Sequence, residues 1–123
     1  MKSSHKAPLH YKLSMCVVLA VFVSVPFVSS ARTNSTSVNF VNNTSRLVRA
    51  VYTSHVGADD WSGNILGSAV TAGQSVALNN ISCDGDQIQL IAEDQDGCFI
   101  RTIITCGSSS TWTINDDTAR DCG

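Results

Sequence analysis

The chain has 123 residues and a formal charge of −2, but all three lysines precede residue 13, so residues 32–123 combine five arginines with ten acidic residues for a charge of −5. Because nucleic-acid binding depends on clustered Lys and Arg, this acidic, lysine-free segment argues against nucleic acid as a partner. The same reasoning argues against anionic membrane surfaces.

The N-terminal segment has the composition of a secretory signal peptide. Residues 15–28 form a nearly unbroken apolar run, the lysines precede it, and the small residues 29–31 follow. This order of basic, apolar and small residues is typical of exported proteins. The alternative is an uncleaved anchor, but a spanning helix needs about 20 apolar residues, and this run is shorter and contains Pro26. We expect residues 1–31 to be removed, leaving a secreted or periplasmic protein without membrane attachment.

The cysteines predict disulfides. Cys16 lies in the predicted signal peptide, and four cysteines remain, at positions 83, 98, 106 and 122. A domain of this size buries only a little over ~60% of its unfolded surface, so cross-links would add much to its stability. Zinc is not expected, because there is no Cys-x-x-Cys pair and His55 is the only histidine beyond the signal.

In chain order, residues 32–37 are polar and predict a flexible lead-in, and from residue 38 apolar and polar residues alternate with the period of strands. In the second strand Val48, Ala50 and Tyr52 are expected to face inward. Val51 breaks this alternation, which predicts a bulge or a strand covered on both faces. The predicted strands are 38–40, 47–53, 75–79, 87–93, 98–106 and 111–115.

The clearest element is a hairpin closed by the turn at residues 95–97. A three-residue loop ending in Gly suits a type I turn followed by a left-handed residue. This turn fixes a register in which Ile88, Leu90 and Ala92 share the inward face. Phe99 and Ile103 lie on the opposite face, so strand 98–106 is expected to be central and covered on both sides. The register pairs Ala92 with Ile100, Leu90 with Thr102 and Ile88 with Ile104.

Six short strands separated by turns, with no segment of helical period, predict an all-β fold. We expect a small antiparallel β-sandwich of about six to seven strands over residues 38–123, stapled by disulfides.

The hairpin register limits how the cysteines can pair. Four cysteines allow three pairings. Cys106 lies opposite Asp86 and therefore near Cys83. Cys98 and Cys106 stand on one strand, eight residues apart, or about 26 Å. A disulfide needs roughly 4.4–6.8 Å between Cα atoms, so these two cannot pair.

The position of the last strand decides between the remaining pairings. If strand 111–115 runs antiparallel beside strand 98–106, the tail carries Cys122 toward Cys98. We therefore predict the disulfides Cys83–Cys106 and Cys98–Cys122.

Acidic residues in the connections suggest a cation site. Loops of a sandwich gather at its two ends, where separate loops can share one ion. The candidate ligands are Asp59, Asp60, Asp116 and Asp117. Two further acidic turns, 84–86 and 94–97, lack the bidentate Glu that ends a calcium-binding EF-hand loop. No cofactor is expected, and calcium is kept as an alternative.

The long connection 55–70 carries the candidate binding residues. Trp61 is either an exposed aromatic for stacking on a sugar or a partner, or a plug that closes one end of the sandwich together with Ile65 and Leu66. The plug is favoured, because three apolar residues lie so close together. The candidate binding residues are Asp59, Asp60, Trp61 and Asn64.

No enzymatic activity is expected. His55 is the only base that titrates near neutral pH, no Gly-x-Ser-x-Gly motif accompanies it, and the predicted disulfides use every remaining thiol. The favoured hypothesis is a non-enzymatic binding or interaction domain with a protein or carbohydrate partner. The alternative is a calcium-dependent or carbohydrate-recognising module that uses the loop acids and Trp61.

Short motifs across residues 38–115 resemble a group of small exported bacterial proteins. In that group a strand ending in Asn-x-Thr leads to Asp-x-Trp, then Leu-Gly, then a Pro-Gly turn and a strand pair. This chain has Ala72 in place of the Pro and adds Cys122. The resemblance implies an exported β-domain and no particular activity. The matching residues are Val41-Asn42-Asn43-Thr44, Asp59-Asp60-Trp61, Asn64-Ile65-Leu66-Gly67 and the turn at Gly73.

Overall fold

The computed structural model describes residues 23–27 and 34–123. Most of the predicted signal peptide lies outside the described residues, and its stretch 23–27 has no regular secondary structure. Within the described residues, no helix has the length and apolar character needed to cross a membrane. The folded unit spans residues 34–123 of the described chain.

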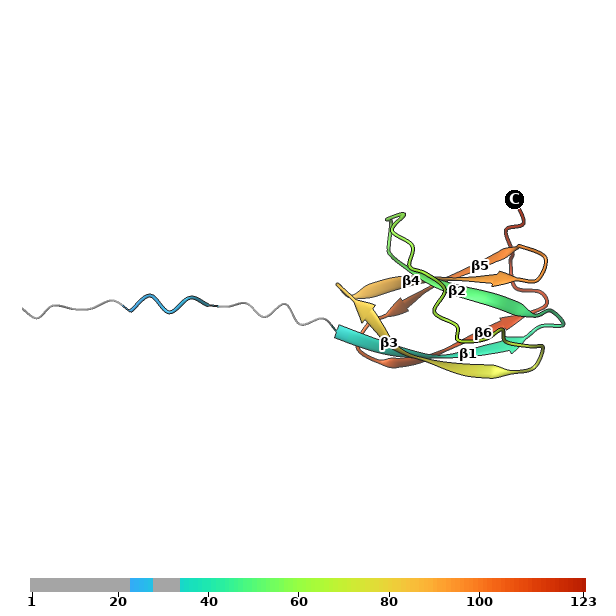
Figure 1. Ribbon diagram of the computed structural model, residues 1–123, viewed down its shortest axis with the longest axis horizontal. Helices are drawn as coiled ribbons and strands as arrows, with labels where there is room; N and C mark the ends of the chain where they lie inside the picture. The colour runs from blue at the N-terminus through green and yellow to red at the C-terminus, as the bar shows by residue number, and fades with distance from the viewer. Residues whose placement is uncertain (1–22, 28–33) are drawn as a thin grey trace, which may run out of the picture. The chain divides into compact units, whose positions relative to one another are not determined.

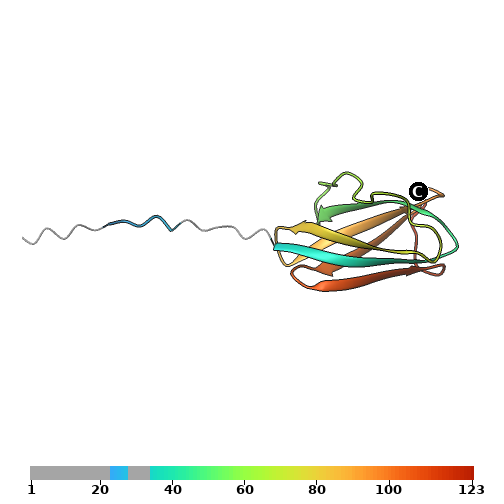
Figure 2. The same ribbon diagram turned by 60° about the horizontal axis from the view of Figure 1, so that its bottom comes forward.

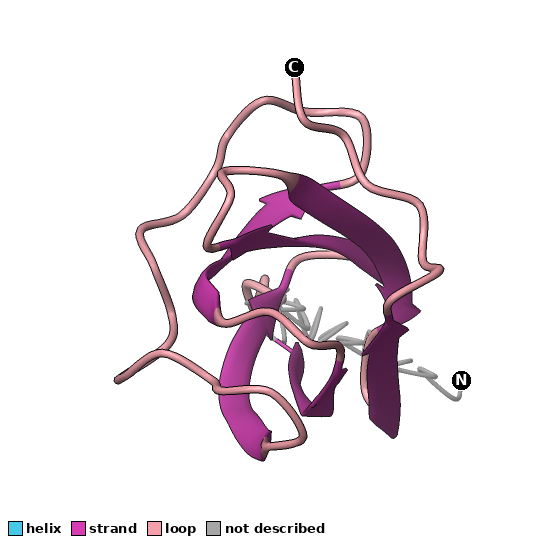
Figure 3. Cartoon of the chain, turned by 90° about the vertical axis from the view of Figure 1, so that its right-hand side faces the viewer, coloured by secondary structure: helices cyan, strands magenta, loops and turns pink. Residues whose placement is uncertain are grey.

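Six strands form two three-stranded sheets that face each other, so the predicted all-β fold is confirmed. One sheet has the order β3-β1-β6 and the other β2-β4-β5. Figures 1 and 2 show the two layers, and the end view in Figure 3 shows the sheets facing each other. The strands are β1 (Asn34–Asn43), β2 (Val48–His55), β3 (Ser75–Cys83), β4 (Gln87–Asp94), β5 (Phe99–Thr105) and β6 (Ser109–Asn115).

The strand neighbours differ from a simple antiparallel meander. β6 lies parallel to β1, so the predicted placement of strand 111–115 beside 98–106 in one sheet is wrong. Alternation specifies which face of a strand is buried but not which strand lies beside it. The lead-in 32–37 is also wrong in part, because β1 begins at Asn34, which pairs with Cys83.

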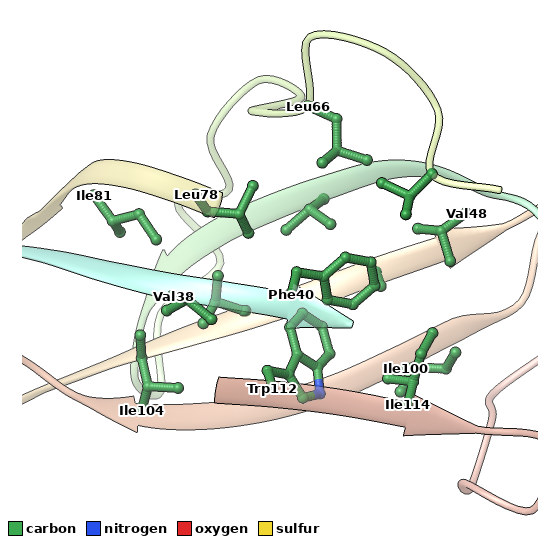
Figure 4. Packing of buried hydrophobic residues seen from close by; sticks show 14 of the residues in the cluster. Val38, Phe40, Val48, Leu66, Leu78, Ile81, Ile100, Ile104, Trp112 and Ile114 are labelled. Atoms are coloured by element: carbon green, nitrogen blue, oxygen red, sulfur yellow. The ribbon is translucent and has the colours of Figure 1, made fainter. Parts of the chain in front are cut away.

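The core fills the space between the sheets (Figure 4). Phe40 on β1 is fully buried, and its ring centroid lies 4.9 Å from that of Trp112 on β6. These rings meet buried aliphatic side chains of the facing sheet, including Leu90 and Ile100. The inward residues predicted for the hairpin are confirmed, as is its register.

A bulge in β2 changes which residues face the core. The register with β4 shifts between Val48 and Ala50, which confirms the predicted irregularity. Beyond the shift Val51 is fully buried in the core. Tyr52, predicted to face inward, therefore lies on the outer face of the sheet.

β5 is an outer strand of its sheet, so the prediction that it is central and doubly covered is wrong. Ile103 is 51% exposed. The central strand is β4, whose Ile91 is buried outside the core cluster on the outer face.

Both predicted disulfides, Cys83–Cys106 and Cys98–Cys122, are present. After β6 the chain crosses back to the other sheet, where Phe99 and Asp121 exchange backbone hydrogen bonds of 2.7 and 2.9 Å. This return brings the tail to Cys98, so the pairing is right although β6 belongs to the other sheet.

The Asn-x-Thr motif at the end of β1 forms a buried turn. Asn42 has no exposed surface, and its Oδ1 accepts hydrogen bonds from the backbone N–H and the hydroxyl of Thr44. Its Nδ2 donates to the carbonyl oxygens of Arg46 at 2.8 Å and Val70 at 3.0 Å. One side chain thus fixes both the β1–β2 turn and the end of the long connection.

Candidate binding site

The connection between β2 and β3 runs back along the free edge of β2. Ser62 N–H donates to the carbonyl of Thr53 at 2.8 Å, and Ile65 N–H donates to that of Val51 at 2.9 Å. Trp61 stands at the start of this paired stretch. It is half-buried and lies over the outer face of the β2-β4-β5 sheet.

Cross-strand pairing assembles an aromatic groove on this outer face. Tyr52 pairs with Ile91, which in turn pairs with Arg101, and the neighbouring row places Phe99 beside Glu93. The groove has a volume of about 360 Å³. We call it the aromatic groove; its lining residues are Tyr52, Trp61, Ser62, Ile91, Glu93, Phe99 and Arg101.

Charged groups surround the aromatic rings. The Arg101 guanidinium carbon lies 6.0 Å from the centroid of the Trp61 ring, a cation–π contact. Tyr52 donates its hydroxyl hydrogen to Glu93 Oε2 at 3.1 Å, and Arg49 forms an ion pair with the same carboxylate. Burial and the hydrogen bond to Glu93 raise the pKa of Tyr52. The groove therefore combines apolar ring faces with hydrogen-bond donors and acceptors at its rim.

The predicted binding residues do not share one role in the structure. Trp61 lines the aromatic groove, whereas Asn64 serves the fold, because its Oδ1 accepts from the backbone N–H of Val51 at 3.1 Å and Leu66 at 3.0 Å. The plug interpretation of Trp61 is wrong: Leu66 enters the core, while Ile65 is 37% exposed.

Most of the groove was missed from the sequence, although the hairpin register contained a signal. A register that turns Ile88, Leu90 and Ala92 inward must turn Ile91 outward with Phe99 and Arg101. An apolar outer row next to an exposed arginine is typical of a contact surface. Tyr52 could not be assigned to this outer face from the sequence, because the bulge in β2 reverses the direction of its side chain.

The four predicted metal ligands do not come together. Asp60 lies just beyond the C-terminal end of β2, where His55 pairs with Ile88. Asp116 lies at the opposite end of the sandwich, where its Oδ1 accepts hydrogen bonds from the backbone N–H and the Oγ of Ser45, both at 3.0 Å. Asp116 also pairs with Arg46 at 3.2 Å. A cation shared by these loops is therefore ruled out by their positions. Across residues 23–27 and 34–123, no three His, Cys, Asp or Glu side chains are grouped to hold a metal ion.

Asp60 instead belongs to a small cluster around His55. Its Oδ1 accepts from Ser54 Oγ at 2.9 Å and from His55 N–H at 3.1 Å, and its Oδ2 contacts His55 Nδ1. His55 Nε2 lies 3.2 Å from Asp84 Oδ2. The cluster ties the loop that carries Trp61 to the β3–β4 turn. Both ring nitrogens of His55 are engaged by carboxylates in this arrangement.

The two carboxylates favour protonated His55. The hydrogen bond to Asp60, followed by the one to Asp84, raises the pKa of His55 above its usual value, and the reciprocal bond lowers the pKa of Asp60 to about 2. The contribution of His55 to stability is thus present below about pH 6.5 and lost as pH rises through its folded-state pKa. The contribution of Asp60 is lost as pH falls toward 2.

NMR titration of the His55 imidazole is expected to give a pKa above the ordinary value of about 6.5. Asp84→Asn removes one of the two carboxylates and should lower this pKa relative to the unsubstituted protein. Asp117→Asn, at the other end of the sandwich, is the control and should leave it unchanged. A His55 pKa at or below 6.5 in the unsubstituted protein would contradict the cluster.

No protein-family model matches the chain, and no curated protein matches it. Among solved structures, the NMR structure of a protein from Eubacterium rectale is similar, with 10% sequence identity and a TM-score of 0.45. The alignment covers 72% of this chain and 85% of the other. At this level the likeness says nothing about the site, and the resemblance to small exported bacterial proteins stays a prediction.

Proposed function

We propose that residues 32–123 form an exported, non-enzymatic binding domain that holds its ligand in the aromatic groove. The observation that carries this proposal is the groove itself. Three aromatic residues, Tyr52, Trp61 and Phe99, gather on one outer sheet face with Arg101 and Glu93 at their edges. Small-molecule sites have this composition, mostly apolar walls with a few polar groups that orient the ligand.

Export is supported by two features. The chain has two disulfides, and stable disulfides belong to oxidising compartments such as the periplasm or the extracellular space. The N-terminal order of basic, apolar and small residues is that of a secretory signal peptide.

The chemistry of the groove favours a carbohydrate as ligand. A sugar ring has an apolar C–H face, which can stack on Trp61, and a rim of hydroxyl groups, which Arg101 and Glu93 can bind. A volume of about 360 Å³ lies near the lower end of the range of small-molecule sites, roughly 300–1,000 Å³. It suits one or two sugar rings.

The test is a fluorescence titration with a panel of soluble oligosaccharides. Trp112 is buried in the core, so Trp61 is the tryptophan whose emission should respond to a ligand in the groove. We expect saturable binding that weakens at least tenfold, or by about 1.4 kcal/mol, in Trp61→Ala. Arg101→Ala should weaken it as well.

Ile103→Ala is the matched control, because Ile103 is exposed on the same strand as Arg101 but does not line the groove. It should bind as the unsubstituted protein does. Equal affinity in Trp61→Ala would show that the groove is not the site, and no saturable binding by any sugar in the panel would overturn the ligand class.

A further inference from the structure

One sheet of the sandwich carries no charge. None of the residues of β1, β3 or β6 is charged, and neither is any residue from 61 to 83. The fourteen charged side chains of residues 34–123 therefore lie on the other sheet, in the connections or in the C-terminal tail. In a segment with a formal charge of −5, an uncharged region is where a second acidic molecule can approach without repulsion.

The free edge of β3 lies in the middle of this uncharged region, beside a second groove that is larger than the aromatic groove. This groove has a volume of about 400 Å³ and runs between β3 and the connection that covers β2. None of its lining residues is charged, and Ile65, which is 37% exposed, stands on its wall. We call it the edge groove; β3 lines it with residues 76–82, and the opposite wall is Thr53, Ser62, Ile65, Leu66 and Gly67.

The edges of the other sheet are protected. The stretch 62–70 covers the edge of β2 with backbone hydrogen bonds. The C-terminal tail pairs with the start of β5 at Phe99. Farther along, β5 exposes the charged side chain of Arg101. Pairing, coverage and charge are common ways of preventing edge-to-edge association. By contrast, the nine residues of β3 include no charge and no proline that would protect its edge.

The sequence of β3 is self-complementary around Ala77. The segment 75–79 ends at a bulge, where the register with β1 shifts and Asn80 adopts a φ of 57°. In an antiparallel pair centred on Ala77, two alanines would meet on the outer face. On the inner face, Val76 of each copy would lie opposite Leu78 of the other, over the edge groove.

We infer that β3 pairs antiparallel with β3 of a second copy, with the two-fold axis at Ala77. The two β3-β1-β6 sheets join into one continuous sheet, and the two edge grooves merge and cover Ile65. Such a contact uses the same surface on both copies, so it closes as a dimer. The two grooves share Ser62, but no residue of β3 lines the aromatic groove, so substitutions in β3 test association separately from ligand binding.

The test compares molar masses by light scattering over the micromolar range. We expect a dimer that dissociates on dilution. Ala77→Asp places two carboxylates opposite each other at the axis, which should raise the dissociation constant at least tenfold. Ala77 is exposed, so the substitution should not prevent folding. Thr113→Asp, at an exposed position on β6 in the same sheet, is the control and should leave the dimer intact.

A cross-link tests the register. Cβ atoms of directly opposed antiparallel residues lie about 4.5–5.5 Å apart, close to the spacing of a disulfide. Ala77→Cys should therefore give a disulfide-linked dimer on a non-reducing gel, and Thr113→Cys should not. A monomer at all concentrations, or a dimer of equal affinity in Ala77→Asp, overturns the inference whatever the sugar titration shows.

Discussion

Reduction of both disulfides is expected to lower the melting temperature by at least about 25 °C. The cross-links close loops with sequence separations of 23 and 24 residues, each worth about 3 kcal/mol by chain entropy. A domain of this size has a total stability of roughly 5–14 kcal/mol. A loss of about 6 kcal/mol, at 4–8 °C per kcal/mol, gives the expected shift. Circular dichroism melts with and without a reductant measure it.

Two double variants separate the contributions. Cys83→Ser/Cys106→Ser removes the link between the two sheets, and Cys98→Ser/Cys122→Ser releases the tail. Each should lower the melting temperature by about half of the full effect, because the two loops have similar lengths. A total shift below about 5 °C on full reduction would show that the core alone holds the fold.

Asp94→Ala is expected to lower the free energy of unfolding by about 3–5 kcal/mol, the usual cost of removing one partner from a buried ion pair. The Asp94 side chain is 1% exposed; its Oδ2 lies 2.6 Å from Arg120 Nη1 and 3.4 Å from Arg46 Nε. Its Oδ1 accepts from the backbone N–H groups of Asp96 and Cys98. The substitution would remove the buried carboxylate from a tight turn and from two arginines, which would keep only their contacts with the exposed Asp96 and Asp116. Urea denaturation at pH 7 measures the change.

The same carboxylate adds an acid dependence. Burial opposes ionisation of Asp94, but the hydrogen bonds from Arg120 and from the backbone of Cys98 and Asp96 outweigh it and lower its pKa. The contribution of Asp94 to stability is therefore present above about pH 4 and is lost as pH falls through the lowered pKa.

Asp117→Ala, at an exposed position, is the control for Asp94→Ala and should change the free energy of unfolding by less than about 0.5 kcal/mol. A loss below 1 kcal/mol in Asp94→Ala would contradict this account.

The parts of the fold that were predicted correctly depend on local signals. The turn at residues 95–97 and the strict alternation on both sides fix the register of β4 and β5. That register places Cys106 near Cys83, and the length of the strand prevents Cys98 from pairing with Cys106. Each of these inferences needs only residues that are near one another in sequence.

The parts that were missed depend on pairing over long distances. The same alternation of Trp112 and Ile114 would suit either sheet, so nothing local indicated that β6 lies beside β1. The bulge was recognised at Val51, but its effect on Tyr52 depends on where β4 resumes pairing. The role of Asp60 as a partner of His55 cannot be predicted from the sequence, because the contact forms only when the loop folds back on β2.

The central position of β1 has a consequence for the order in which the domain can form. β1 is the first strand made, yet one of its two neighbours is β6, the last, so the sheet stays incomplete until residue 115 is available. The β4–β5 hairpin needs only nearby residues and can form earlier, whereas pairing between distant strands is slow. A chain that stops before residue 109 would expose an uncharged, aggregation-prone edge on β1. We therefore expect C-terminal truncation to impair folding far more than the small size of β6 suggests.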